Sequence, residues 1–249
     1  MTDMFSIERK KAIVTGACTG LGKGVADAYL KAGAKVAIID INPETEKIAS
    51  GFSDNCIGVC ADLGNRTELA ESFEKAVKLL GGLDIMVNNA GIQRRHKCEE
   101  FPIEDWDQVI EVNLTSVFLL CQLAGRVMLE QGSGKIVNIA SILSFCGGFT
   151  VPAYAASKGA VAQLTKTLSN EWASKGINVN AIAPGFCDTD LNSALIADVN
   201  RHRQILERIP AGRWGTPDDI GGIAVFLASE ASNYFHGSVV TVDGGYMGR

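Results

Sequence analysis

The fold is decided by the stretch Thr15–Gly22, with the sequence TGACTGLG, which follows directly on the short apolar segment Ala12–Thr15. A helical pattern comes next. A strand that turns through small residues into a helix lets the backbone approach a pyrophosphate, and the free N–H groups at the helix N-terminus bind it. We expect Gly16 to open the turn and Gly20 and Gly22 to permit the close approach. The stretch therefore predicts the start of a dinucleotide-binding fold.

Six further strand-like segments follow, separated by longer helical patterns. They are apolar on successive residues rather than alternately, which is typical of parallel strands covered on both faces. Helix starts are also recognisable at Asn65 and at Thr216-Pro217. The pattern predicts an α/β fold, a Rossmann-type doubly wound seven-stranded parallel sheet with helices on both faces, in one domain over residues 1–249. The predicted strands are Ala12–Thr15, Lys35–Asp40, Cys56–Cys60, Asp84–Asn88, Lys135–Ala140, Asn178–Ile182 and Ser238–Val242.

Composition excludes several other classes of protein. The 249 residues are 47% hydrophobic, which is enough for a full hydrophobic core. The net charge is −5 and the sequence has no basic run, so neither nucleic acid nor an anionic membrane is an expected partner. No apolar stretch approaches the length of a membrane span, and Met1–Lys11 lacks the apolar region of a signal peptide. We expect a cytoplasmic protein. The seven cysteines include no C-x-x-C pair and mostly lie in apolar runs, which favours buried, reduced thiols. Because a structural zinc site needs four ligands that converge and the chain has only three histidines, we expect no metal site.

An acidic residue ends the second predicted strand. Asp40 lies 18 residues after Gly22, where a carboxylate accepts hydrogen bonds from the adenosine ribose hydroxyls and repels a 2′-phosphate. The following residues, Ile41, Asn42 and Pro43, carry no positive charge. The pattern favours NAD(H) over NADP(H). The alternative is that Asp40 only caps the turn that follows it.

Tyr154 and Lys158 lie four residues apart, so on a helix they share one face. A nearby ammonium favours the phenolate, which lets a tyrosine exchange a proton with an alcohol or ketone near neutral pH. Ser141 follows the predicted strand Lys135–Ala140, and its hydroxyl is placed to hold the same substrate oxygen. The order of cradle, serine and tyrosine indicates an oxidoreductase.

Together these motifs resemble the short-chain dehydrogenase/reductase family over essentially the whole chain, and they include Asn88-Asn89-Ala90-Gly91, Asn113 and Pro184-Gly185. The resemblance implies Tyr154 as general acid/base, Ser141 as binder of the substrate oxygen, Lys158 as activator of the tyrosine and ribose contact, and Asn113 as organiser of a proton-relay water. It implies NAD(H) binding by Gly16, Thr19, Gly20, Leu21, Gly22, Asp40, Ile41, Asp62, Leu63, Asn89, Ala90, Gly91, Tyr154, Lys158, Pro184, Gly185, Cys187 and Thr189.

A narrower resemblance is to the branch of the family that acts on sugar acids, carried by Gln93-Arg94-Arg95, Ile139–Phe145, Ile209–Gly215 and Val242–Tyr246. It implies interconversion of a secondary alcohol and a ketone on an acid of the 2-keto-3-deoxygluconate or 2-deoxygluconate type, by a homotetramer. Arginine suits a carboxylate, and we expect either Arg94 or Arg95 to dominate, unless both serve the surface or a subunit contact. The implied substrate-binding residues are Arg94, Arg95, Ser141, Leu143 and Tyr154.

Other activities stay open at this point. A gluconate 5-dehydrogenase-like activity, or action on a polyol, a steroid or a 3-ketoacyl substrate, fits the same motifs. The segment Leu191–Arg203, which normally covers the substrate in the family, departs from the resemblance. Within Leu191–Glu207, the stretch Arg201-His202-Arg203 offers a further cation in a lid. A non-catalytic nucleotide-sensing module is the alternative outside enzymes, but the intact set of Asn113, Ser141, Tyr154 and Lys158 argues against it.

Overall fold

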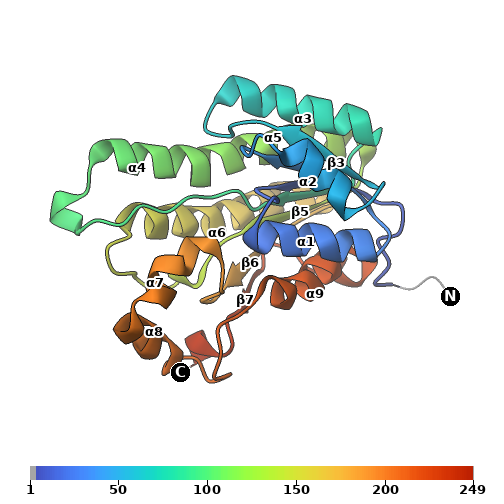
Figure 1. Ribbon diagram of the computed structural model, residues 1–249. Helices are drawn as coiled ribbons and strands as arrows, with labels where there is room; N and C mark the ends of the chain where they lie inside the picture. Colours follow the sequence, from blue (N-terminus) through green and yellow to red (C-terminus); the bar gives the residue numbers. More distant parts are fainter. Residues whose placement is uncertain (1–3, 249) are drawn as a thin grey trace.

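The computed structural model describes residues 4–248 and confirms the predicted fold class. Seven strands form one parallel sheet in the order β3-β2-β1-β4-β5-β6-β7 (Figure 1). Sequential strands run outward on each side of β1 and β4, which is the doubly wound arrangement. The strands are β1 (Lys11–Thr15), β2 (Lys35–Asp40), β3 (Cys56–Cys60), β4 (Ile85–Asn88), β5 (Gly134–Ile139), β6 (Ile177–Pro184) and β7 (Val239–Val242).

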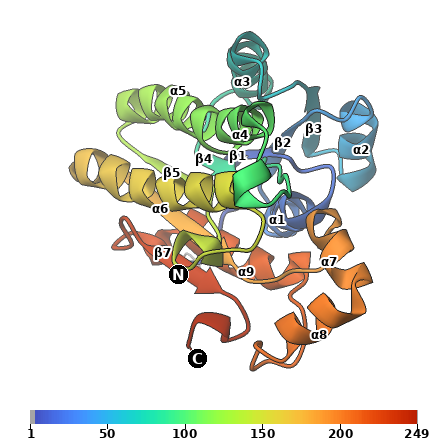
Figure 2. The same ribbon diagram turned by 90° about the vertical axis from the view of Figure 1, so that its left-hand side faces the viewer.

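Helices cover both faces of the sheet, as the uninterrupted apolar strands require (Figure 2). On one face α1 (Gly20–Lys31) and α9 (Pro217–Ala228) pack together and bury one set of strand residues, including Val14 and Ile38. On the other face α3 (Arg66–Leu80), α5 (Ser116–Gln131) and α6 (Pro152–Trp172) bury the alternate set, including Ile13 and Ile39. The short helix α2 (Thr45–Phe52) connects β2 to β3.

The predicted strands and helix starts correspond closely to the observed ones. Only β6 is appreciably longer than expected, because Ala183 and Pro184 still pair with Thr241 and Val242 of β7. The Asn65 side chain accepts hydrogen bonds from the backbone N–H groups of the first turn of α3, as a helix cap does. Capping and strand patterning are thus local properties that the sequence predicts well.

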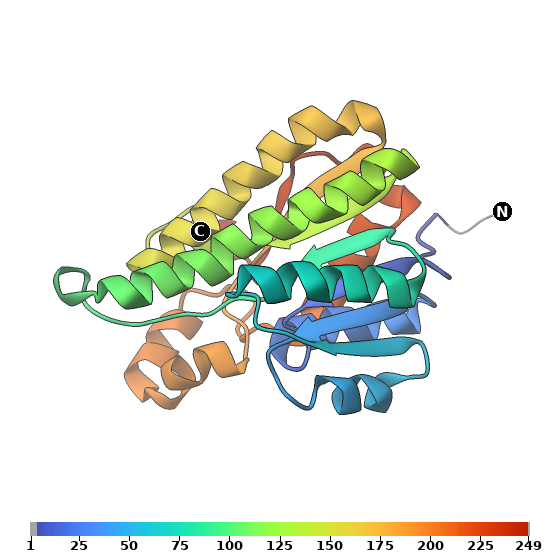
Figure 3. The same cartoon turned by 90° about the horizontal axis from the view of Figure 1, so that it is seen from above.

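One long helix runs from Ile103 to Gln131 through α4 (Ile103–Ile110), a wider turn at Glu111–Thr115 and α5. It is the one helix of residues 4–248 that is long and apolar enough to cross a membrane, a property that the sequence analysis did not find. Its α5 portion packs on β4, β5 and α6, which is the position of a core helix. Figure 3 shows α5 and α6 lying side by side across the sheet.

The cysteines differ in part from the expectation. All seven are free, and Cys18, Cys56, Cys121 and Cys187 are buried, but Cys60 and Cys98 are exposed. Cys60 is the last residue of the edge strand β3, and Cys98 belongs to a short surface turn, so neither is covered by a helix.

Candidate active site

The glycine-rich turn between β1 and α1 forms the floor of a cavity of about 500 Å³. Gly16 has a φ of +61°, a conformation that favours glycine. Gly22 packs so tightly that a Cβ atom there would lie 2.2 Å from the carbonyl oxygen of Gly16. The cavity extends from this turn to α6, and most of the predicted cofactor residues line it: Gly16, Thr19, Gly20, Leu21, Asp40, Ile41, Asp62, Leu63, Asn89, Ala90, Gly91, Tyr154, Lys158 and Thr189.

Four predicted cofactor residues do not line this cavity. Gly22 lies beneath the turn, and Pro184 is the buried end of β6. Gly185 borders the adjacent cavity instead. Cys187 is buried, and burial raises the pKa of its thiol to about 11, so it is an unreactive thiol at neutral pH. Gly22 and Pro184 thus support the site through packing, and the expected cofactor contacts of Gly185 and Cys187 stay predictions.

The end of β4 holds the turn in place. The Asn89 amide donates to the carbonyl oxygens of Thr15 and Gly16 at 2.9 and 2.8 Å. The Thr15 hydroxyl in turn accepts from the backbone N–H groups of Asn89 and Ala90, both at 3.0 Å. Asn89 therefore shapes the cradle through its side chain, a function that its place in the Asn-Asn-Ala-Gly motif does not reveal.

Asp40 lies at the carboxyl end of β2, on the wall of the same cavity. Its carboxylate accepts from the backbone N–H of Cys18 at 2.9 Å and from that of Asn42 at 3.1 Å. Asp40 thus does cap the turn that follows it. A carboxylate has about four acceptor sites, so Asp40 can still accept hydrogen bonds from ribose hydroxyls. Among the described residues that line the cavity, the only cations are Arg94 and Lys158, which come from other elements.

Tyr154 and Ser141 form the centre of the site. The Ser141 hydroxyl accepts from the backbone N–H of Leu143 at 3.1 Å, and Ser144 ties this short turn to α6 through a 2.6 Å hydrogen bond to the carbonyl oxygen of Lys158. The turn that carries Ser141 is therefore held against the helix that carries Tyr154. Burial raises the pKa of Tyr154 to about 12, while hydrogen bonding from Ser141 works in the opposite direction.

Lys158 does not lower the pKa of Tyr154 in the way the sequence analysis expected. Its ammonium lies 5.7 Å from the centroid of the Tyr154 ring and donates to the carbonyl oxygen of Ile139 at 2.6 Å. The side chain is buried, and this burial lowers its own pKa to about 8. The ammonium is turned toward the backbone of β5, and burial is the main cause of the raised pKa of Tyr154.

Asn113 is fully buried in the wide turn between α4 and α5, a helical irregularity often found at functional sites. Its amide accepts from the backbone N–H of Ile92 at 2.8 Å, and donates to the Ile92 carbonyl at 2.9 Å and to the Ser157 hydroxyl at 3.3 Å. Both amide hydrogens are thus occupied. The side chain fixes the loop after β4, and the expected role in holding a water molecule stays a prediction.

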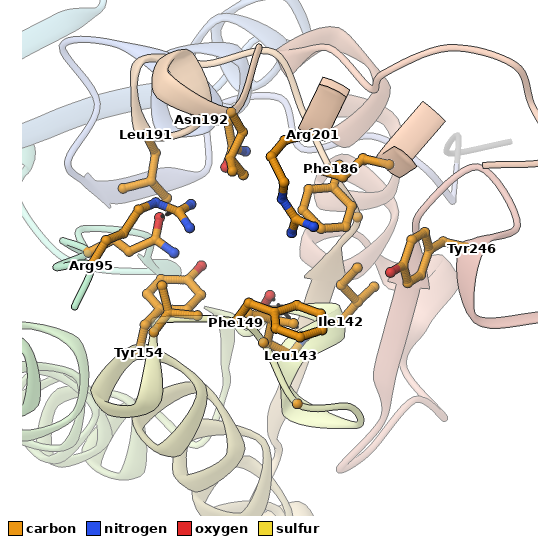
Figure 4. Close-up of a pocket in the computed structure, with 18 of the residues that line it drawn as sticks. Arg95, Ile142, Leu143, Phe149, Tyr154, Phe186, Leu191, Asn192, Arg201 and Tyr246 are labelled. Atoms are coloured by element: carbon orange, nitrogen blue, oxygen red, sulfur yellow. Dashed lines mark hydrogen bonds between the residues drawn. The ribbon is translucent and has the colours of Figure 1, made fainter. Parts of the chain in front are cut away.

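A second cavity, of about 320 Å³, opens beside Tyr154 (Figure 4). Of the predicted substrate residues, Arg95, Ser141, Leu143 and Tyr154 line it. Arg94 does not: its guanidinium lies 3.5 Å from Asp105 and donates to Gln108 at 2.9 Å, away from the second cavity. Arg95 donates only to the neutral Gln93 amide, at 3.1 Å, among the hydrogen bonds of residues 4–248. The structure thus separates the two arginines.

Several lining residues were not predicted as substrate contacts. Arg201, noted only as a further cation, comes from α8 (Val199–Leu206), which with α7 (Ser193–Ala197) lies beyond the carboxyl edge of the sheet (Figure 1). Tyr246 and Phe186 pack edge to face and close the far end. No local motif marks these side chains, because distant segments bring them together. None of the described residues that line this cavity is acidic.

The fold and the site are those of a nucleotide-binding oxidoreductase. The chain matches the family model described as enoyl-(acyl carrier protein) reductase over residues 16–247. It is 49% identical to the 2-dehydro-3-deoxy-D-gluconate 5-dehydrogenase of Bacillus subtilis, over 99% of this chain and 98% of that one, and 41% identical to the 5-keto-D-gluconate 5-reductase of Escherichia coli, over 99% of each. A gluconate 5-dehydrogenase from Burkholderia cenocepacia, solved with NADP and tartrate, is 38% identical with a TM-score of 0.95, over 99% of this chain and 98% of that one. The chain belongs to the short-chain dehydrogenase/reductase family.

Proposed function

We propose that the chain is an NAD(H)-dependent oxidoreductase that interconverts a secondary alcohol and a ketone on a sugar acid of the 2-keto-3-deoxygluconate type. The observation that carries the proposal is the meeting of three groups at one cavity. Tyr154 and Ser141 present a proton-exchanging pair, and Arg95 presents a guanidinium with no carboxylate of residues 4–248 in ion-pair contact. A hydroxylated acid satisfies both ends of this arrangement.

The first cavity fits a nicotinamide dinucleotide. The turn at Gly16 and the helix N-terminus at Gly20 suit a pyrophosphate, because a Cβ atom on Gly16 would lie 2.8 Å from the Ala90 Cα atom and narrow the cradle. The cavity extends to Tyr154 and Lys158, so its far end adjoins the reacting groups. When bound, the nicotinamide ring accepts or supplies the hydride.

The residues of the chain then handle the proton and the orientation of the substrate. Ser141 donates a hydrogen bond to the substrate oxygen, and Tyr154 exchanges the proton with that oxygen. A pKa of about 12 keeps Tyr154 protonated at neutral pH, which suits proton donation to a ketone undergoing reduction. Lys158, fixed by the Ile139 carbonyl, borders the same cavity and is placed to meet a ribose hydroxyl.

The preference for NAD(H) rests on Asp40. Its carboxylate lies at the end of β2 on the cavity wall, where the adenosine ribose would bind, and Ile41, Asn42 and Pro43, which follow it, carry no charge. The cations among the described lining residues, Arg94 and Lys158, come from other elements. A 2′-phosphate would face this carboxylate without a positive partner, which is unfavourable. The relative from Burkholderia cenocepacia holds NADP, so the dinucleotide preference of this chain depends on its own residues at the end of β2.

The sugar-acid substrate is supported by the relatives and by the cavity. Two relatives are named for the interconversion of keto and hydroxy sugar acids, and a third was solved with tartrate, a hydroxylated acid. The side chains Gln93 and Asn192 also line the cavity and suit hydroxyl groups. Apolar side chains such as Leu143 and Phe186 also line the cavity, so the charge of Arg95 is the feature that favours an acid over an uncharged steroid.

The proposal is tested by following NADH absorbance with a panel of ketones: 2-keto-3-deoxygluconate, 5-ketogluconate, an uncharged keto sugar, a steroid and a 3-ketoacyl thioester. We expect the highest kcat/KM with a keto sugar acid. Arg95→Gln is expected to raise KM for the acid about 10- to 150-fold, the equivalent of one charge-assisted hydrogen bond, with kcat less affected. Arg203→Gln, whose side chain lines neither cavity, is the matched control. Preference for an uncharged ketone would refute the proposal.

We further propose the homotetramer and the cytoplasmic location that the family resemblance implies. Apolar side chains of α5 stand on the surface, with Phe118 42% and Leu129 36% exposed, and such positions suit a subunit contact. Light scattering during size-exclusion chromatography measures the assembly. A monomer at micromolar concentration would contradict the tetramer.

A further inference from the structure

We propose that Arg201, carried by α8 to the cavity that Arg95 borders, forms with Arg95 a two-guanidinium clamp that closes over the carboxylate of an anionic substrate. This inference rests on the proposed function, because it assigns a second residue to the same substrate group. It makes α8 a specificity element: the helix would cover Tyr154 fully only when the substrate bears a negative charge.

The two arginines reach the cavity from different elements. Arg95 follows β4, on the loop that Asn113 fixes through Ile92, whereas Arg201 belongs to the first turns of α8. Figure 4 shows both side chains extending into the cavity near the hydroxyl group of Tyr154. Burial and, to a smaller extent, the charge of Arg201 lower the pKa of Arg95, while Tyr154 works in the opposite direction. One carboxylate has two oxygens and can accept from both groups.

Neutral partners hold Arg201 in the structure. Its guanidinium lies 5.4 Å from the centroid of the Phe149 ring and donates to the Gln204 amide at 2.8 Å. Two arginines outside the cavity have acidic partners: Arg203, also on α8, lies 3.9 Å from Glu207, and Arg213 lies 2.7 Å from Asp219. Arg208, which also lines the cavity, packs 4.3 Å from the centroid of the Tyr246 ring at its far end. A glutamine one turn away and an exposed ring are partners that Arg201 can exchange for an anion without leaving a buried charge unpaired.

The surroundings explain why binding and closure would be linked. Since no described residue that lines the cavity is acidic, the repulsion between Arg95 and Arg201 is uncompensated until an anion enters. The position of α8 depends otherwise on a small apolar cluster in which Ile205 packs with Ile209 and Trp214. An anion between Arg95 and Arg201 attracts both guanidinium groups and so replaces their mutual repulsion. A neutral analogue leaves the repulsion in place.

The kinetic test uses the full chain and compares Arg201→Gln with Arg203→Gln, a control on the same helix whose side chain lies outside the cavity. Reduction of 2-keto-3-deoxygluconate is compared with reduction of its methyl ester. We expect Arg201→Gln to lower kcat/KM for the acid about 10- to 150-fold, mainly through KM, and to leave the ester within about twofold of wild type. In an Arg95→Gln background the same change should cost much less, because the bridge is already broken. Equal losses for acid and ester, or an equal loss in Arg203→Gln, would overturn the clamp.

A binding test does not depend on turnover. His202 stacks on Trp214, with ring centroids 5.6 Å apart, so a movement of α8 changes the surroundings of this indole. In a chain carrying Trp106→Phe and Trp172→Phe, Trp214 fluorescence is titrated with D-gluconate in the presence of NAD. We expect a saturable change in this chain and in its Arg203→Gln form, and at least a 10-fold weaker Kd with Arg201→Gln. An unchanged Kd in Arg201→Gln would overturn the clamp. Absence of turnover with every sugar acid would overturn the proposed function instead.

Discussion

Replacing Lys158 with methionine is expected to stabilise the folded chain at pH 7 while abolishing turnover. Burial lowers the pKa of Lys158 from its ordinary 10.5 to about 8, so carrying the charge in the folded state costs about 3 kcal/mol, at 1.36 kcal/mol for each pKa unit. Methionine has similar length and no charge. The lost hydrogen bond to the Ile139 carbonyl offsets about 1 kcal/mol of this, which leaves a net gain of about 2 kcal/mol.

The gain should depend on pH in a defined direction. Because the pKa is lower in the folded state than in the unfolded state, the unfolded chain binds more protons between pH 8 and 10.5. The wild-type stability therefore rises with pH across this window, and the penalty is complete below pH 8. The advantage of Lys158→Met should be largest at pH 7 and fade toward pH 10.5.

The assay is the free energy of unfolding from urea titrations at pH 7 and at pH 10. Lys166→Met is the matched control, since Lys166 lies on the same helix with its side chain exposed and should change stability by less than about 0.5 kcal/mol. The reasoning is wrong if Lys158→Met is less stable than wild type at pH 7, or if its advantage over wild type is the same at both pH values.

The other predictions concern the cofactor cavity. Asp40→Ala should relax the preference for NAD over NADP, measured as the ratio of kcat/KM values; an unchanged ratio, or a wild-type enzyme that prefers NADPH, would show that Asp40 does not contact the ribose. Gly22→Ala should weaken NADH binding by at least 10-fold in a fluorescence titration, because its Cβ atom would lie 2.2 Å from the Gly16 carbonyl and displace the cradle, whereas Gly222→Ala, with open space around it, should bind normally. Normal NADH affinity in Gly22→Ala would mean that the turn adapts.

The fold was predictable because its determinants are local. The apolar runs, the Thr15–Gly22 turn and the cap at Asn65 each specify a strand, a turn or a helix start within a few residues. The long helix from Ile103 to Gln131 was the exception: its apolar part is α5, a continuous stretch of sequence that the sequence analysis did not single out.

The sequence predicted most residues of the site, but not all of the contacts that orient them. Tyr154, Ser141 and the cofactor contacts follow from motifs, yet the choice between Arg94 and Arg95 depends on Asp105 and Gln108 of α4, which hold Arg94 away from the second cavity. Burial raises the pKa of Tyr154, an effect that depends on packing and that the spacing of Tyr154 and Lys158 does not reveal. The activation of Tyr154 by Lys158 stays a prediction. The clamp partner Arg201 belongs to a segment without a recognisable motif.

The most direct test of the account is the turnover of Tyr154→Phe with a keto sugar acid and NADH, measured together with the Kd for NADH. The phenolic hydroxyl is the group that exchanges the proton, while the cradle and Lys158 remain intact. We predict a fall in kcat of about 10²–10⁴-fold with NADH affinity within about threefold of wild type. Turnover close to that of the wild type would contradict the assignment of Tyr154 as the general acid/base.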